Sequence, residues 1–244
     1  MKEKLLRALD FVSTIVYGCL AVLFIGVLIT SIGKNVIDIC DRMGVTWKAD
    51  VNYFGLFAGF GAYLIYFILY LIIPKIKHNL TWFMKFTHEL THTLVALLFF
   101  AKIHKFIVME RECDVYYESK VGYVPITLSP YCIPIYTFML FPFRFAGDNE
   151  FMIVFDFLIA FSYAFHVHSF IKYTRYSQSD IQGCGPALST TFITFVHLCV
   201  LSLIAVTPKA GVLNAIHRVF WEYPADILTS PIAWFRDIIK YYYP

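Results

Sequence analysis

Residues 88 to 92 read His-Glu-Leu-Thr-His, which matches the pattern H-E-x-x-H. Side chains four positions apart lie on one face of a helix, so the imidazoles of His88 and His92 can bind one metal ion. Glu89 lies about 100° round the helix from His88, where its carboxylate can reach a water at the metal without being a ligand. In zinc peptidases, these residue types in this order activate water for peptide hydrolysis. The pattern therefore predicts a zinc ion bound by His88 and His92, with Glu89 as the catalytic base.

The apolar run LVALLFF comes soon after this pattern, so the polar side chains lie in a segment suited to lipid. An ionised side chain at the centre of a span costs about 2.5–3.5 kcal/mol even on the lower scales. A metal ion would offset that cost by coordinating both imidazoles and attracting the carboxylate. A lone histidine on an apolar face is more often an ordinary core residue, and so short a pattern also arises by chance. Three ionisable groups within five residues favour the metal site over these alternatives.

The composition is that of a membrane protein. Of the 244 residues, 59% are hydrophobic and 15% are charged, whereas about 25% of the residues in soluble domains are charged. The net charge of +3 is small and no basic patch is interleaved with aromatics, so nucleic acid is not an expected partner. The six cysteines are scattered without a C-x-x-C pair, which indicates free, mostly buried thiols. We expect an all-α membrane protein with about six transmembrane helices.

Six apolar stretches are close to the length of about 20 residues that a helix needs to cross a bilayer. They are residues 11–32, 53–73, 82–100, 124–143, 151–170 and 188–206. The third stretch carries the two histidines, and Asn79 is the predicted N-cap of its helix. The fourth contains four prolines, which predict a broken segment that can be re-entrant.

Two further segments lie at the membrane edge. Between residues 101 and 124, charged residues alternate in part with β-branched and aromatic ones, which predicts one or two short strands. The aromatic-rich tail, residues 212–243, is typical of an interfacial helix rather than a seventh span. We therefore expect one integral membrane domain over residues 1–244, with two N-terminal spans (1–78), a core that holds the predicted metalloprotease site (79–207) and an interfacial tail (208–244). The basic N-terminus favours a cytoplasmic start for this multi-pass chain.

The segment THELTH on an apolar helix, followed by a strand-like edge and further spans, resembles the site-2 protease family of intramembrane zinc metallopeptidases. Residues 122–140, 161–170 and 176–193 resemble a short bacterial branch of that family. The resemblance implies a zinc metalloendopeptidase of the bacterial cytoplasmic membrane that hydrolyses a peptide bond within or next to a transmembrane segment. The two histidine ligands of the family map onto His88 and His92, and its catalytic glutamate maps onto Glu89.

The third zinc ligand of the family is an aspartate in Leu-Asp-Gly, a tripeptide that this chain lacks. The resemblance and the local backbone favour Asp180 in QSDIQG, because the nearby Gly-Cys-Gly can leave helical geometry at membrane depth. The alternative role of Asp180 is N-cap of the helix predicted from residue 188. Asp156 is the second candidate, because a carboxylate inside an apolar span is a functional candidate by default. His166 is the third, and His168, about 200° away on the same helix, cannot face the same metal.

Two other functions stay open on sequence alone. The first is a non-catalytic membrane protein that acts as an assembly or interaction module, with its metal site structural or absent. The second is an enzyme of lipid or quinone chemistry, which usually needs several histidine clusters, whereas this chain has one strong pair. The expected partners are the lipid bilayer and a membrane-protein substrate, and a regulatory membrane partner is left open.

Overall fold

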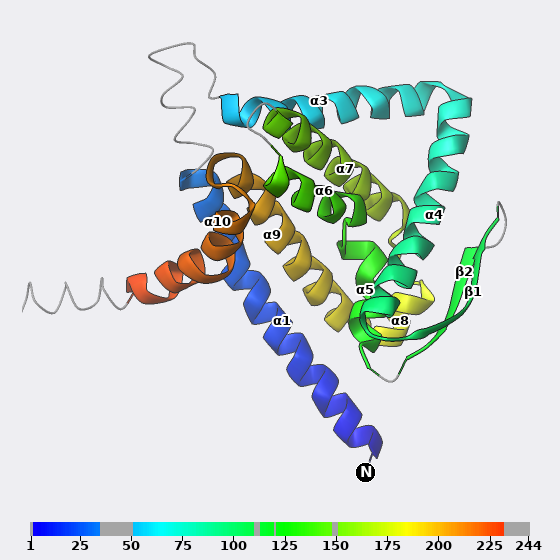
Figure 1. The fold of residues 1–244 in the computed structure, drawn as a ribbon. Coiled ribbons are helices and arrows are strands. Elements are labelled where there is room, and N and C mark those ends of the chain that lie inside the picture. The colour runs from blue at the N-terminus through cyan, green and yellow to red at the C-terminus, as the bar shows by residue number, and fades with distance from the viewer. Residues whose placement is uncertain (1, 35–50, 110–112, 120, 148–150, 232–244) are drawn as a thin grey trace, which may run out of the picture.

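A computed structural model describes residues 2–34, 51–109, 113–119, 121–147 and 151–231, and Figure 1 shows how they fold. A long helix comes first in the chain, and a hairpin and a broken helical segment separate two groups of long helices. The elements are α1 (Lys2–Ile32), α3 (Val51–Ile72), α4 (Pro74–Leu98), β1 (Lys102–Val108), β2 (Cys113–Glu118), α5 (Tyr123–Cys132), α6 (Ile135–Ala146), α7 (Met152–Tyr173), α8 (Ser179–Cys184), α9 (Pro186–Ala210), α10 (Val212–His217) and a π-helical turn (Arg218–Glu222).

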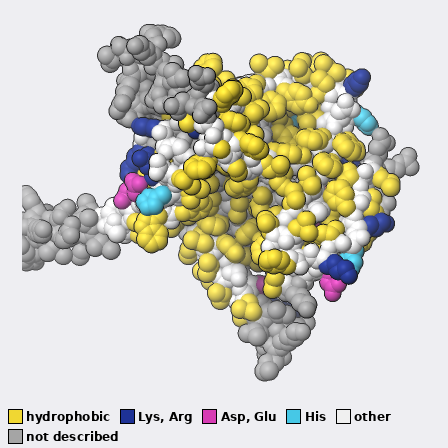
Figure 2. All heavy atoms as spheres, viewed as in Figure 1, with side chains coloured by type: hydrophobic (Ala, Val, Ile, Leu, Met, Phe, Trp, Pro, Cys, Tyr) yellow, Lys and Arg dark blue, Asp and Glu magenta, His cyan; other side chains and the backbone are white. Residues whose placement is uncertain are grey.

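In the described part of the chain, the helices α1, α3, α7 and α9 are long and apolar enough to cross a membrane. The helices α5 and α6 count as a fifth span if they form one broken segment, and they are bent by 82° relative to each other. The face in Figure 2 is mostly hydrophobic, with the charged side chains toward its margins. These are the features of an all-α membrane protein with one small hairpin. The broken fourth segment is confirmed, but the predicted total of six spans is not, because Lys85, His88, Glu89 and His92 make α4 less apolar.

The long helices pack in two pairs, α1 along α9 and α3 along α7. Glycine permits the second pair: a Cβ at Gly55 would lie 2.2 Å from the carbonyl oxygen of Ile153, and one at Gly59 would lie 2.2 Å from that of Phe157. Only residues without a side chain let two backbones approach so closely, as small residues do in membrane helix pairs. The buried core between the pairs includes Phe24, Leu56, Ile159, Val200 and Leu203.

The hairpin lies beside α4, the helix that carries the histidines (Figure 1). Its strands β1 and β2 are antiparallel neighbours, which confirms the strands predicted between residues 101 and 124. The ring of Phe86 in α4 contacts that of Phe106 in β1 edge-on, with the centroids 6.2 Å apart. A two-stranded sheet therefore borders the helix of the candidate site.

The helix α4 begins earlier than predicted. It starts at Pro74, with Ile73 as its N-cap, so Asn79 lies inside the helix and the prediction that it caps the helix was wrong. Proline suits the first helical position because its φ is already helical and its missing N–H would have no partner there. His88 therefore lies roughly four turns, or about 21 Å, from the start of α4.

Two smaller predictions concern the tail and the cysteines. The chain is helical from α10 through the π-helical turn to residue 231, and residues 232–244 lie outside the described part. The interfacial position of this tail stays a prediction. The structure describes four free cysteines, of which Cys19 is exposed and Cys132, Cys184 and Cys199 are buried. For these four, the prediction of free and mostly buried thiols is confirmed.

Candidate metal centre

Within α4, the threonine hydroxyls near the motif have hydrogen-bond acceptors, whereas the two histidine side chains face other elements of the fold. The hydroxyls of Thr87, Thr91 and Thr93 donate to the carbonyl oxygens four residues earlier, at 2.8, 2.8 and 2.9 Å. These hydroxyls are therefore satisfied within the helix. The imidazoles of His88 and His92 have no such local acceptor, and buried polar groups of this kind need partners from elsewhere in the fold.

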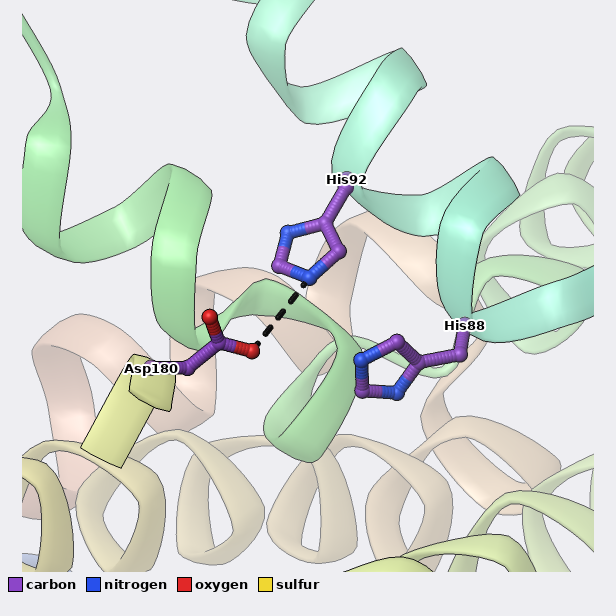
Figure 3. Close-up of side chains that lie close together, drawn as sticks. All are labelled: His88, His92 and Asp180. Atoms are coloured by element: carbon purple, nitrogen blue, oxygen red, sulfur yellow. Dashed lines mark ion pairs between the residues drawn. The ribbon is translucent and has the colours of Figure 1, made fainter. Parts of the chain in front are cut away.

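Asp180, in the first turn of α8, meets these two histidines, as Figure 3 shows. A ring nitrogen of His88, a ring nitrogen of His92 and a carboxylate oxygen of Asp180 lie within 4.8 Å of one another. His92 Nε2 and Asp180 Oδ2 are 3.6 Å apart, which is too far for a hydrogen bond. The ligand atoms of a tetrahedral zinc ion, with bonds of about 2.0–2.2 Å, are roughly 3.4 Å apart. The three groups therefore fit one zinc ion after a small contraction.

The second ring nitrogen of His92 is held by α5. Nδ1 lies 2.9 Å from the carbonyl oxygen of Ile126, and because a carbonyl only accepts, Nδ1 carries the proton. This carbonyl is available because its helical donor would be the N–H of Pro130, which proline lacks. Nε2 is left facing Asp180 as the metal-binding atom. Metal-binding histidines are oriented in this way by a partner at the other nitrogen.

Tyr131, also in α5, contacts both Asp180 and His88. Its hydroxyl donates to Asp180 Oδ2 at 2.9 Å, and its ring meets the ring of His88 edge-on, with the centroids 5.2 Å apart. Asp180 lies outside the candidate membrane spans. Burial acts to raise the pKa of its carboxyl group, but contacts with neighbouring groups, among them the hydrogen bond from the Tyr131 hydroxyl, outweigh burial and lower that pKa. Asp180 is therefore an ionised carboxylate at neutral pH and can bind a cation.

Asp180 does not cap a helix, which was its alternative role. The N-cap of α8 is Gln178 and that of α9 is Gly185, and neither helix has a side-chain cap hydrogen bond. His88 and His92 lie in the second half of α4, and α8 follows α7 near the C-terminal end of α4 (Figure 1). The length of α4 is therefore what lets His88 and His92 reach Asp180.

Asp156 is not brought to this site. Its Oδ1 accepts a hydrogen bond from Arg144 Nε at 2.8 Å and its Oδ2 accepts one from Arg144 Nη2 at 3.3 Å. Both side chains are 3% exposed. Arg144, in α6, thus supplies the positive charge that a buried carboxylate needs. The ion pair with Arg144, and not metal binding, therefore accounts for a carboxylate at position 156 inside an apolar span.

The two histidines of α7 are also outside the ligand group. His166 is buried, and its Nε2 has no hydrogen-bond partner among the described residues. His168 Nδ1 lies 2.8 Å from the hydroxyl of Tyr63, and its ring packs edge-on against Phe67 and Tyr70. The surroundings of the two rings differ, as their spacing on the helix predicts, and His168 packs against α3.

Glu89 lies next to His88 in α4, is 8% exposed and does not belong to the ligand group. The role of Glu89 as the base stays a prediction. Sequence analysis missed Tyr131 and His197, whose Nε2 contacts the carbonyl oxygen of Tyr131 at 3.0 Å. A histidine inside the apolar stretch 188–206 was a usable signal for a buried polar contact. Nothing in the sequence marked Tyr131 apart from its place between Pro130 and Pro134.

The chain matches no family model, and no curated protein or solved structure is significantly similar to it.

Proposed function

We propose that this chain is an intramembrane zinc metalloendopeptidase, similar to the site-2 protease family, that cleaves a peptide bond within or next to a transmembrane segment of another membrane protein. The observation that carries the proposal is the approach of His88 and His92 from α4 to Asp180 from α8. Two imidazoles and one carboxylate are a donor set that zinc accepts, and three protein ligands leave the fourth position free, as in catalytic sites. We also propose a multi-pass topology in the bacterial cytoplasmic membrane.

In the proposed hydrolysis, each residue of the site has a separate role. A zinc ion bound at this site would supply Lewis-acid activation of the attacking water and of the scissile carbonyl. Glu89 accepts a proton from that water and delivers it to the leaving nitrogen as the carbon–nitrogen bond breaks. The carbonyl of Ile126 orients His92, and the hydroxyl of Tyr131 orients Asp180. The substrate segment must unwind locally, because a helical peptide bond is shielded by its own hydrogen bonds.

The replacement Glu89→Gln separates hydrolysis from metal binding. Glutamine keeps the size of the side chain but cannot accept the proton from water, so zinc content should be unchanged while cleavage falls by at least about 100-fold. Cleavage is measured in a bacterial host with a library of reporters, each of which carries one transmembrane helix between two tags. The matched control is Glu222→Gln, in the π-helical turn outside the site, which should leave both zinc content and cleavage unchanged.

Two outcomes would contradict the proposal. If the wild-type chain cleaves no more reporters than the Glu89→Gln variant, the chain is not this hydrolase, and a bracing or assembly role is favoured. If Glu89→Gln abolishes zinc binding together with cleavage, Glu89 is a ligand or a structural residue rather than the base.

A further inference from the structure

A chain of hydrogen bonds leads from the helix bundle to Asp180. The hydroxyl of Tyr163 in α7 lies 3.1 Å from Nδ1 of His197 in α9. His197 Nε2 lies 3.0 Å from the carbonyl oxygen of Tyr131 in α5, and the hydroxyl of Tyr131 donates to Asp180 Oδ2 in α8 at 2.9 Å. Four residues on four separate elements are thus connected, and the last of them is the candidate third ligand.

The direction of each hydrogen bond follows from the chemistry of the groups. The carbonyl oxygen of Tyr131 can only accept, so Nε2 of His197 carries the proton and donates it. The neutral ring then accepts at Nδ1, so the hydroxyl of Tyr163 is the donor there. The network fixes the tautomer of His197 and satisfies both of its ring nitrogens.

The carbonyl of Tyr131 is free for His197 because of where α5 ends. The helix stops at Cys132, and the carbonyls of a last helical turn have no partner within the helix. His197 satisfies one of them and thereby ties the end of α5 to α9. The side chain of Tyr131 is 1% exposed, so this residue is held at its backbone by His197 and around its ring by close packing.

We propose that Tyr131 is a positioning residue for the metal ligand Asp180, and that His197 holds Tyr131 in place, so that the zinc affinity of the site depends on two residues that do not touch the ion. The inference rests on the proposed zinc site, but its test is metal binding rather than peptide cleavage. The helix α8 has six residues, and its Asp180 carboxyl can rotate about the Cβ–Cγ bond unless a donor fixes it. The hydroxyl of Tyr131 fixes that rotation with Oδ2 toward His92.

The replacement Tyr131→Phe tests this directly, because it removes one oxygen atom and keeps the ring. Zinc affinity of the full chain in detergent, measured by competition with a chelator, should fall about 10- to 100-fold, as it does when outer partners of metal ligands are removed. The visible absorption bands of the Co²⁺-loaded chain should shift, because the carboxylate is held differently. The matched control is Tyr53→Phe: Tyr53 is also 1% exposed, and its hydroxyl donates to the carbonyl oxygen of Ala205 at 2.9 Å, away from the site.

A pair of replacements at His197 tests the second part. Glutamine places an amide N–H near the position of Nε2 and can still donate to Tyr131, whereas leucine cannot. His197→Gln should therefore keep zinc affinity within about threefold of the wild type, and His197→Leu should lower it about tenfold. Rescue by glutamine separates the hydrogen bond from a simple packing role for the imidazole.

The outcomes separate this inference from the proposed function. If Tyr131→Phe binds zinc as tightly as Tyr53→Phe and its Co²⁺ bands do not move, Tyr131 has no positioning role although the zinc site stands. If His197→Leu matches His197→Gln in zinc affinity, His197 does not act through its hydrogen bond. If the wild-type chain binds no zinc at all, the proposed function fails, and this inference fails with it.

Discussion

Asp156 and Asp180 lie near the two ends of α7, and both are acids in a largely apolar chain, but their partners differ in charge. Asp156 is paired with the guanidinium of Arg144 at 2.8 Å, and both side chains are 3% exposed. Asp180 accepts a hydrogen bond from the neutral hydroxyl of Tyr131 and lies 3.6 Å from a ring nitrogen of His92. The first acid is compensated by the chain itself, whereas the second faces two imidazoles.

Asp156 is buried and Asp180 is half-buried, and the partners of each acid decide what that acid can do. A carboxylate withdrawn from water needs positive charge nearby, and one that lacks it destabilises the fold. At Asp156 the ion pair is complete, so this region is structural. The carboxylate of Asp180 and the ring nitrogens of His88 and His92 can together bind a cation from solution. The residue type alone would not have distinguished these two roles.

The largest expected difference is between Asp180→Asn and Asp156→Asn. Asp180→Asn removes one charged ligand, so zinc affinity should fall by at least about 100-fold while the metal-free chain keeps its stability. Asp156→Asn leaves Arg144 buried without a counter-charge, so stability should fall by about 3–5 kcal/mol while folded chains keep their zinc affinity. Chelator competition and thermal unfolding in one detergent give both quantities. If both variants lose stability equally and neither loses zinc affinity, the two regions are alike and the comparison is wrong.

The double replacement Arg144→Met with Asp156→Leu tests whether these two buried charges only neutralise each other. It removes both charges together, and apolar pairs of similar volume often replace buried ion pairs at little cost. Stability should therefore return to within about 1 kcal/mol of the wild type, with zinc affinity unchanged. A double variant as unstable as Asp156→Asn would show that the charges have a role beyond compensating each other.

A smaller effect is expected where α3 packs on α7 beside Asp156. A Cβ added at Gly55 would lie 2.2 Å from the carbonyl oxygen of Ile153, so Gly55→Ala should lower stability by about 1–3 kcal/mol. Zinc affinity should not change, because the strain lies near the other end of α7. The control is Gly61→Ala in the same helix, where nothing lies within 4 Å of the added Cβ and stability should hold or rise slightly. Equal losses in the two variants would argue against the close helix contact.

The smallest effect is expected at an exposed ion pair. Lys34 Nζ lies 3.1 Å from Asp226 Oδ2, with the side chains 52% and 55% exposed. Water compensates both charges there, so Asp226→Asn should change the free energy of unfolding by only about 0–1 kcal/mol. Thermal unfolding beside Asp156→Asn is the measurement. A loss as large as that of Asp156→Asn would mean that burial is not what separates the two pairs.

The elements that could be predicted from the sequence are those with local signals. Apolar runs gave α3, α7 and α9 to within four residues at each end, whereas α1 and α4 begin nine and eight residues before the predicted stretches. Prolines marked the break between α5 and α6, and partial alternation marked the hairpin. The motif fixed the spacing of His88 and His92, since that spacing is a property of any helix. The early start of α4 was missed because Asn79 was taken as its N-cap, whereas the helix begins at Pro74.

The rest depended on contacts between distant parts of the chain. Whether Asp180 or Asp156 meets the histidines is set by the course of α7 and by Arg144, which no local pattern relates to either acid. The carbonyl of Ile126 meets His92 across 34 positions, and His197 meets Tyr131 across 66. A motif can predict metal ligands on one helix, but it cannot predict which residues of other helices lie close to those ligands.

His88, His92 and Asp180 together hold one zinc ion in the proposed enzyme. The direct measurement is the zinc content of the purified full chain and of the variants His88→Ala, His92→Ala and Asp180→Ala, all equilibrated at the same free zinc concentration. We expect one zinc ion per wild-type chain and almost none in each variant, with Asp156→Ala keeping its zinc where it remains folded. A wild-type chain without zinc, or variants that keep it, would contradict the account.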